Sequence, residues 1–513
     1  MKLPRSFLVI VLSVALVLIF FKSVYAQSAN QSDNGGSDPQ EIVNPSDVTG
    51  PDPQEGVTNN DNTTGGTNVE IDRTAFDKSF ESAPVEQAVE QFEELQAVEI
   101  GERFGTSFFG EIASTSDIAQ TLKNLCQQTG QNAALLYVAS LKDKLNLILI
   151  LPSGAQQSPS SNSKCLNSAS DNIQPIRKDI LEAKHSTVQK VAQEFRSKIT
   201  NYRNEKNNYL VASQKLYQWI VTPFEPALQA NKINTLIFSM DSGLRSIPIA
   251  ALHDGKQFII EKYGVALIPS FSLTDTRYAP IAKSEVLAMG VSESTEDQVP
   301  LPFAGVEVNT LTSKIWPGQA QALLNKASTI ENLKSVSSKQ RFGIIHLATH
   351  GQFNPGELTK SYIQLWNEKI RLNQLRTLSQ ELKWSANPKV EMLVLSACTT
   401  ALGNNEAELG FAGLAVQAGV KTALGSLWYV SDEGSLALMT KFYNDLKTTS
   451  LRSLALRQAQ LGMLKGEVRI QNGNLRLSEN NLVPLPPELD VAENINLSHP
   501  YFWSAFTVIG NWN

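Results

Sequence analysis

The sequence predicts an α/β fold in which a mostly parallel sheet is covered by helices on both faces. Short continuous apolar runs recur along the chain, and segments with the apolar spacing of amphipathic helices lie between them. Of the 513 residues, 42% are hydrophobic and 18% are charged, which is enough apolar material for a large buried core. The chain therefore folds as one large domain or two smaller ones.

Residues 1–26 have the pattern of an export signal. Lys2 and Arg5 precede an uncharged apolar stretch of 16 residues from Ser6 to Phe21, and the small residue Ala26 ends a junction that suits cleavage. A membrane-spanning helix needs roughly 20 apolar residues. We expect a cleaved signal peptide, with a membrane anchor as the alternative, and in both cases a body that is exported to the periplasm or the exterior.

Residues 27–70 are poor in large apolar side chains and rich in Asn, Asp, Gly, Ser, Pro and Gln. A segment of this kind buries too little surface to offset the entropy of ordering, so we expect a disordered linker. Residues 153–171 have a similar composition and predict a surface loop.

The expected folded region has an N-terminal part, residues 71–230, and a core, residues 231–513. The first part is expected to contain a β-hairpin and two amphipathic helices. In the core, residues 499–510 are expected to form a strand that closes the sheet. The hairpin strands are predicted at 133–138 and 145–151, the helices at 180–199 and 209–228, and the core strands at 235–238, 265–268, 285–290, 343–347, 392–395 and 421–427.

A histidine and a cysteine each follow one of these core strands. His350 and Cys398 are 48 positions apart, and both would lie where a strand gives way to a loop, the usual place for reactive groups in α/β sheets. Cysteine attacks as a thiolate and needs a nearby base. The pattern predicts the His-Cys dyad of a cysteine peptidase, while an isolated cysteine would more often be a small buried hydrophobe.

Five motifs occur in order along the chain: residues 241–248 (DSGLRSIP), 348–351 (ATHG), 395–398 (LSAC), 425–428 (GSLW) and 499–503 (HPYFW). Through them the chain resembles the CHAT family, the caspase-like domain of separase-related peptidases, in its cyanobacterial form. The resemblance begins at about Gln87 and extends to the C-terminus. It implies a caspase-like three-layer α/β/α fold, endopeptidase activity, and an oxyanion hole formed by the backbone N–H groups of Gly351 and Cys398.

In caspase-like enzymes, the stretch that matches residues 428–433 lines the pocket for the residue before the cleaved bond. Asp432 and Glu433 would then favour substrates with Arg or Lys at that position. Alternatively, both acids only begin a helix, where acids are favourable, and the pocket lies elsewhere, with Asp241 as a candidate. Ser396, two residues before Cys398, is an uncharged candidate for substrate contact.

The other two cysteines, Cys126 and Cys165, either pair in an oxidising compartment or are small buried hydrophobes. His346 lies four residues before His350, but Leu347 replaces the glutamate of a zinc-binding His-Glu-x-x-His helix and the segment is predicted to be a strand. We therefore expect no metal and assign His346 to the core as a hydrogen-bonded histidine.

Composition and motifs also limit the partners. The net charge of −6 provides no basic surface for nucleic acid, and the sequence lacks a P-loop, a dinucleotide fingerprint and a Gly-x-Ser-x-Gly elbow, so no cofactor is expected. The expected partner is a protein or peptide substrate, with possible membrane anchorage through the N-terminal segment. Two alternatives are a catalytically silent CHAT module that binds proteins and a thiol enzyme that transfers acyl groups. The sequence does not specify the oligomeric state.

Overall fold

The computed structural model describes residues 72–105, 110–153, 165, 174–203, 207–295, 298–354, 358–386, 389–396, 399–400, 413–449, 451–489, 491 and 494–513. The expected signal peptide, the linker, most of the 153–171 loop and Cys398 lie outside these residues.

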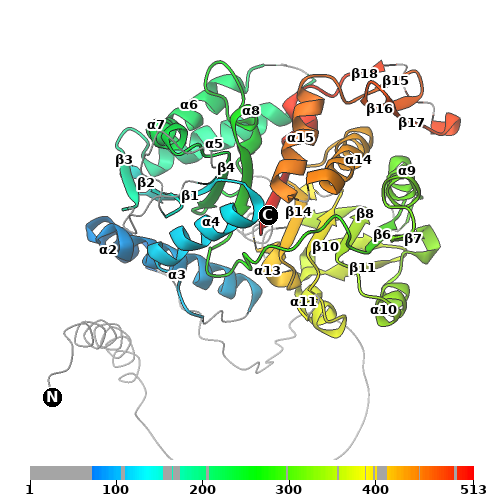
Figure 1. The fold of residues 1–513 in the computed structure, drawn as a ribbon, viewed down its shortest axis with the longest axis horizontal. Coiled ribbons are helices and arrows are strands. Elements are labelled where there is room, and N and C mark those ends of the chain that lie inside the picture. The colour runs from blue at the N-terminus through cyan, green and yellow to red at the C-terminus, as the bar shows by residue number, and fades with distance from the viewer. Residues whose placement is uncertain are drawn as a thin grey trace, which may run out of the picture. The chain divides into compact units, whose positions relative to one another are not determined.

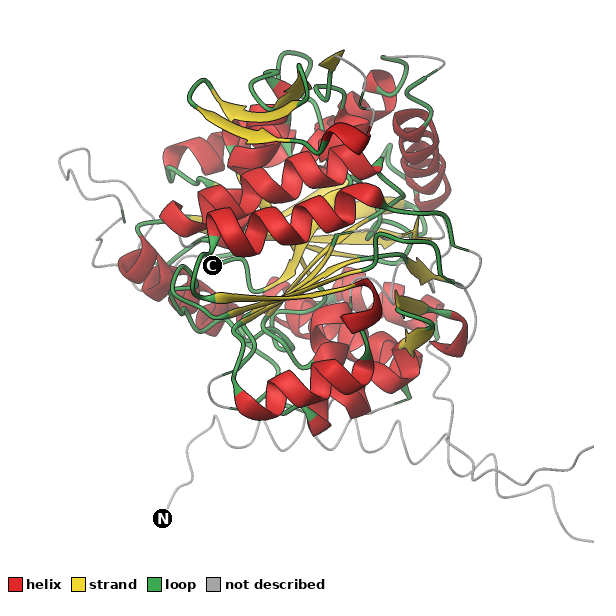
Figure 2. Ribbon diagram, turned by 90° about the vertical axis from the view of Figure 1, so that its right-hand side faces the viewer, coloured by secondary structure: helices red, strands yellow, loops and turns green. Residues whose placement is uncertain are grey.

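An eleven-stranded sheet with helices on both faces forms the centre of the structure (Figures 1 and 2). Its strands are mostly parallel and fully buried in the middle, which confirms the predicted α/β class. In spatial order they are β3 (Ile176–Ile180), β2 (Lys144–Ile150), β1 (Ala133–Leu141), β4 (Thr235–Met240), β5 (Gly264–Ile268), β19 (Phe506–Gly510), β14 (Thr422–Ser426), β12 (Met392–Leu395), β8 (Ile344–Ala348), β6 (Val286–Gly290) and β7 (Ala320–Leu324).

Nine strands of the sheet form two parallel sets that run in opposite directions, and β2 and β3 add an antiparallel edge. Strands β1, β4, β5 and β19 are parallel to one another, as are β14, β12, β8, β6 and β7, whereas β19 and β14 are antiparallel. The carboxyl ends of the two sets of strands therefore lie at opposite edges. Strands from before and after residue 230 share this one sheet.

The last strand lies in the centre of the sheet. The expected strand over residues 499–510 is instead the short helix α16 (Pro500–Trp503) followed by β19, which joins the two halves between β5 and β14. Pro500 suits the first position of a helix because its missing N–H is not needed there.

The two helices predicted before residue 230 form, but with different bounds. The helix expected at 209–228 is interrupted at Pro223, because proline lacks an N–H and clashes with the preceding turn. The helix expected at 180–199 begins only at His185, since residues 176–180 form the edge strand β3. The α-helices are α2 (Arg73–Ser82), α3 (Val85–Phe104), α4 (Thr115–Thr129), α5 (His185–Thr200), α6 (Leu210–Ile220), α7 (Glu225–Ala230), α8 (Ile259–Lys262), α9 (Pro302–Thr310), α10 (Ile330–Lys339), α11 (Leu372–Glu381), α13 (Leu414–Ala418), α14 (Asp432–Thr449), α15 (Arg452–Leu464) and α16.

Two small sheets accompany the main one. The first has the order β11 (Glu368–Arg371), β10 (Tyr362–Leu365), β9 (Gly351–Phe353) and β13 (Thr399–Thr400), so it continues the chain directly after His350 and after Cys398. The second contains β17 (Asn481–Pro484), β16 (Asn474–Ser478), β15 (Arg469–Gln471) and β18 (Asn494–Ile495).

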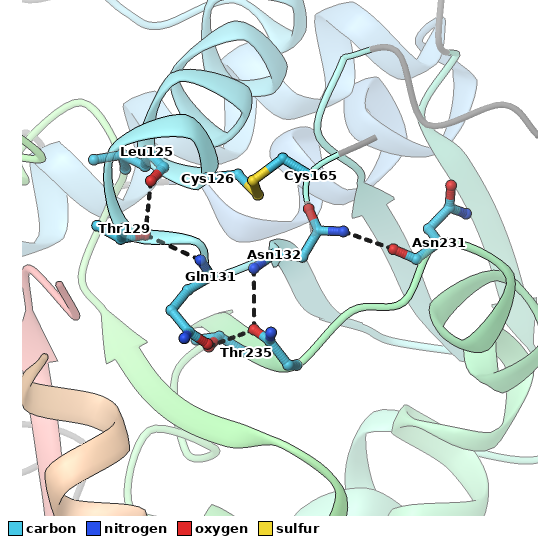
Figure 3. Close-up of a disulfide and its surroundings, with 9 residues drawn as sticks. Leu125, Cys126, Thr129, Gln131, Asn132, Cys165, Asn231 and Thr235 are labelled. Atoms are coloured by element: carbon cyan, nitrogen blue, oxygen red, sulfur yellow. Dashed lines mark hydrogen bonds between the residues drawn. A yellow bond between two sulfur atoms is a disulfide. The ribbon is translucent and has the colours of Figure 1, made fainter. Parts of the chain in front are cut away.

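A disulfide joins Cys126 near the end of α4 to Cys165, 39 positions later (Figure 3). Of the two alternatives for these cysteines, the structure has the paired one. Closing a loop of this length stabilises the fold by about 4 kcal/mol in the chain-entropy account. Beside it, Asn132 ties the start of β1 to the turn before β4 through hydrogen bonds to Asn231 and Asn234.

Candidate active site

His350 lies in the short connection between β8 and β9, at the carboxyl end of β8. Two hydrogen bonds with Gln364 of β10 fix this connection: the Gln364 N–H donates to the His350 carbonyl oxygen (2.8 Å), and the Thr349 hydroxyl donates to the Gln364 carbonyl oxygen (2.7 Å). Thr349 is buried, whereas His350 is half-buried. The backbone of His350 is thus held firmly while its imidazole remains accessible.

The Val299 carbonyl group orients this imidazole. Its oxygen lies 2.8 Å from His350 Nε2. A carbonyl oxygen only accepts hydrogen bonds, so Nε2 carries the hydrogen and, in the neutral ring, Nδ1 has the free lone pair. Among the described residues, none forms a hydrogen bond with Nδ1. His350 is therefore arranged to take up a proton at Nδ1.

The residues on either side of Cys398 are placed next to the same two strands that frame His350. Before it, Leu395 of β12 pairs with Leu347 of β8, and the Ser396 N–H donates to the Leu347 carbonyl oxygen (3.0 Å). After it, Thr399 of β13 pairs with Gln352 of β9. The short segment that contains Cys398 thus begins beside the strand that precedes His350 and ends beside the strand that follows it.

The topology also marks this edge of the sheet. From β6 the chain goes outward to β7 and then returns to form β8 on the other side of β6. In open α/β sheets, ligands bind in the crevice outside the carboxyl ends of the strands at such a reversal. This point is flanked by residues 291–295 and 298–301, which follow β6 and include Val299, and by His350, which follows β8.

His346 is the hydrogen-bonded core histidine that the sequence predicts. It is fully buried, and its Nδ1 lies 3.1 Å from the Tyr443 hydroxyl. Its Nε2 lies 2.7 Å from a carboxylate oxygen of Glu307 in α9, at ion-pair distance, although the angle is not that of a hydrogen bond. Burial, and then the Glu307 charge, raise the pKa of Tyr443 well above its usual value. Within the described part of the chain, no three metal-binding side chains come together.

The three residues expected to contact substrate have different surroundings. Asp432 and Glu433 begin α14, and Asp432 Oδ2 accepts a hydrogen bond from the Phe303 N–H at the start of α9 (2.8 Å). Burial raises the pKa of Asp432 to about 7, and the nearby Glu307 and Glu433 charges add to the effect. Glu433 is half-buried and its side chain forms no hydrogen bond or ion pair with another described residue, whereas Ser396 is 2% exposed.

Sequence reasoning missed the hydrogen-bond partner of His350. Val299 contributes its main-chain oxygen, and every residue type has one, so the sequence gives no sign of this role. Its side chain is 63% exposed. Tyr429, in the stretch that was predicted to line the pocket, is 39% exposed, and burial, followed by the charges of Asp432 and Glu433, raises its pKa.

A cavity of about 810 Å³ lies elsewhere, between α2, the β1–β2 turn and the start of α5. Its lining is strongly charged, but Arg73 and Lys144, two of its cations, are already paired with acids of the protein. It contains none of the residues around His350, and we assign it no part in the chemistry.

A family model for the CHAT domain matches residues 210–511, which is more than half of the chain. The chain belongs to the CHAT domain family. No curated protein matches the CHAT chain significantly along its sequence.

Solved structures resemble this CHAT protein only distantly. In the Saccharomyces cerevisiae separase-securin complex, the similarity covers 86% of this chain and 37% of the solved chain, with 8% identity and a TM-score of 0.41. For the complex of the Porphyromonas gingivalis RgpB pro- and mature domains the shares are 63% and 74%, with 8% identity and a TM-score of 0.35. For gingipain R, an Arg-specific cysteine proteinase, they are 64% and 74%, with 9% identity and a TM-score of 0.33. The family assignment rests on the family model alone.

The CHAT motif that begins at Asp241 lies away from His350. Asp241 follows β4, whose carboxyl end is at the opposite edge of the sheet, and it is 1% exposed. Its carboxylate is paired with Arg73 and accepts the N–H groups of Ser140 and Ser242 (both 2.8 Å). Asp241 is therefore not part of a pocket beside His350, which corrects that alternative. It links the CHAT domain to α2.

Proposed function

We propose that this protein is an exported cysteine endopeptidase in which His350 and Cys398 form the catalytic dyad. The observation that carries the proposal is the Val299 carbonyl bond to His350 Nε2, because it leaves Nδ1 to act as the base. The paired segments on both sides of Cys398 support its placement beside this nitrogen. Membership of the CHAT family agrees with the reaction class.

The reaction would proceed in two steps. His350 Nδ1 removes the thiol proton of Cys398, and the sulfur attacks the carbonyl carbon of the scissile peptide bond. The backbone N–H groups of Gly351 and Cys398 stabilise the oxyanion that forms. The C–N bond then breaks as Nδ1–H protonates the leaving amine. Nδ1 finally removes a proton from a water molecule whose oxygen attacks the thioester carbon, and the C–S bond breaks as Nδ1–H returns the proton to the sulfur.

Substrate contact by Asp432, Glu433 or Ser396 is a further part of the proposal, and the surroundings favour Glu433. Asp432 already accepts a hydrogen bond from Phe303, and Ser396 is buried. Glu433 is half-buried with no internal partner, so its carboxylate is the one that a substrate Arg or Lys could reach.

The Cys126–Cys165 disulfide supports export, because disulfides persist mainly in oxidising compartments. It agrees with the predicted signal peptide. No helix among the described residues has the length and apolar character to cross a membrane.

The proposal is tested with a fluorogenic peptide library on the purified chain, beside Cys398→Ala and His350→Ala. We expect the wild type to cleave a subset of peptides and both variants to lose that activity. Cys126→Ser with Cys165→Ser is the matched control, since it alters cysteines that are remote in sequence from the dyad. Cleavage that survives Cys398→Ala would refute the thiol mechanism. Binding of peptides without cleavage in the wild type would support the silent module.

A further inference from the structure

Helix α9 begins without a cap of its own. Leu301 occupies the N-cap position and has no polar side chain, and Pro302 follows it. The acceptor comes from another helix: Asp432, the first residue of α14, accepts the Phe303 N–H at 2.8 Å. A carboxylate or other oxygen at this place satisfies an N–H that the helix leaves unpaired and interacts well with the helix dipole.

The loop that leads into α9 is the one that holds His350. The Leu301 N–H donates to the Ser292 carbonyl oxygen (3.1 Å), and the Ser294 hydroxyl donates to the Gln298 carbonyl oxygen (2.7 Å). Val299 lies between these two fixed points. The residue before it and the residue two positions after it are thus hydrogen-bonded within the same loop, and the second of them, Leu301, is the N-cap residue of α9.

Two contacts connect α9 and the residues before it to β8 and its end. Glu307, in the second turn of α9, has a carboxylate oxygen 2.7 Å from Nε2 of His346 in β8. Val299 accepts a hydrogen bond from His350, which lies four residues after His346 in the turn that follows β8. The Asp432 contact with Phe303 lies between Val299 and Glu307 in the sequence. The side chains of Leu301, Phe303 and Ala304 also anchor this turn in the core, so the Asp432 contact is the polar part of its attachment.

We propose that Asp432 is a positioning residue for His350. By capping α9 from α14 it fixes the loop that presents the Val299 carbonyl to the imidazole, and so sets which ring nitrogen faces Cys398. The inference rests on the proposed dyad and gives Asp432 a role other than substrate contact. This role needs the side-chain oxygen of residue 432 and not its charge, because an uncharged oxygen in the same place would accept the same Phe303 N–H.

Kinetics of two variants separate these roles. Asp432→Ala removes the acceptor, and we expect kcat to fall about tenfold with KM within about twofold of the wild type. Asp432→Asn keeps a carbonyl oxygen and should recover kcat to within about threefold. The preference for Arg over Ala before the cleaved bond should not change in either variant. Thr329→Ala is the matched control, because it removes the side-chain cap of α10 and should leave kcat unaltered.

The opposite pattern would overturn the proposal. A raised KM and a lost Arg preference that Asn fails to rescue would make Asp432 a substrate-binding residue. Wild-type kcat in Asp432→Ala would make its contact with Phe303 irrelevant to catalysis. Should Asp432→Ala not fold, Asp432→Ser, with a shorter acceptor, is expected to give the same defect to a smaller extent, and wild-type values there would also contradict the inference.

A readout that needs no peptidase activity keeps the two proposals apart. The pH dependence of Cys398 alkylation reports its thiolate, and the ¹⁵N shifts of His350 report its tautomer. If His350→Ala leaves the alkylation profile of the wild type unchanged, the dyad itself fails. If the dyad holds and Asp432→Ala alters neither the profile nor the tautomer, only the role of Asp432 fails.

Discussion

Asp241 and His350 each follow a buried strand, one in each parallel set of the main sheet, but they differ in burial and in the number of their hydrogen-bond partners. Asp241, after β4, is buried and has both oxygens occupied by Arg73 and backbone N–H groups. His350, after β8, is half-buried, and only Nε2 has a partner in the described part of the chain. A saturated group stabilises a fold, whereas a group with one atom held and one atom open is ready for chemistry. Position at a strand end alone does not distinguish them.

The largest expected effects come from substituting His350 and Asp241, because the first should change activity and the second stability. His350→Ala should lower kcat/KM at least about a thousandfold, as expected for one member of a catalytic unit, with little change in unfolding. Asp241→Ala should instead cost roughly 3 kcal/mol of stability, because it leaves the Ser140 and Ser242 N–H groups without an acceptor and leaves Arg73 with Asp77 alone. The measurements are peptide cleavage per folded molecule and urea unfolding. Loss of stability in His350→Ala and loss of activity alone in Asp241→Ala would contradict the roles assigned to the two residues.

Next in size is the disulfide, which lies in the half that carries Asp241. Replacing Cys126 and Cys165 with Ser should lower the free energy of unfolding by about 2–4 kcal/mol. Cleavage by the folded protein should be unchanged, because neither residue contacts the His350 edge. The check is unfolding with and without reductant, with the double Ser variant insensitive to the reductant.

A smaller effect concerns pH. Burial, assisted by Glu307 and Glu433, raises the pKa of Asp432 from 3.8 to about 7. The folded protein therefore keeps this proton over a range in which the unfolded chain has released it, so this group destabilises the fold as pH rises from about 4 to about 7 and no further above that. We expect a loss on the order of 2 kcal/mol, well below the full conversion of the pKa change because the side chain is partly exposed.

Asp432→Asn is the control for this pH effect, since the amide does not titrate. Its free energy of unfolding, measured at pH 5 and pH 8, should differ by less than that of the wild type. An identical pH dependence in the two proteins would assign the effect to other groups.

The smallest effect concerns specificity. Glu433→Gln should reduce the preference for Arg over Ala before the cleaved bond by about tenfold or less, because the side chain is open to solvent that screens its charge. Matched peptides that differ only at this position provide the measurement. An unchanged ratio of Arg to Ala cleavage would mean that residues other than Glu433 form the specificity pocket.

Much of the architecture could be predicted because its strands are continuous apolar runs. In the main sheet, the missed strands are the two outermost ones: β3 contains Arg177, Lys178 and Asp179, and β7 is only partly buried, so neither has the apolar signature of the central strands. The short strands of the two small sheets were also missed, because two to five residues carry too little pattern to be recognised. The helix break at Pro223 could have been predicted from the sequence, because proline interrupts a helix without help from the rest of the fold.

The site was only half predictable, for a physical reason. His350 follows an apolar strand and is therefore visible as a residue type. Its partner is the main-chain oxygen of Val299, and the cap of α9 joins Phe303 to Asp432 across 129 positions. Contacts of these kinds depend on tertiary packing and leave no local pattern.

The central claim is that His350 activates Cys398, and one measurement tests it most directly. Because Cys126 and Cys165 are paired, Cys398 is the remaining cysteine of the three, and its alkylation rate against pH can be followed in the wild type and in His350→Ala. The account predicts rapid alkylation well below pH 8.5 in the wild type and a shift of the profile toward the ordinary thiol pKa of about 8.5 in the variant. Coincident profiles in the two proteins would contradict it.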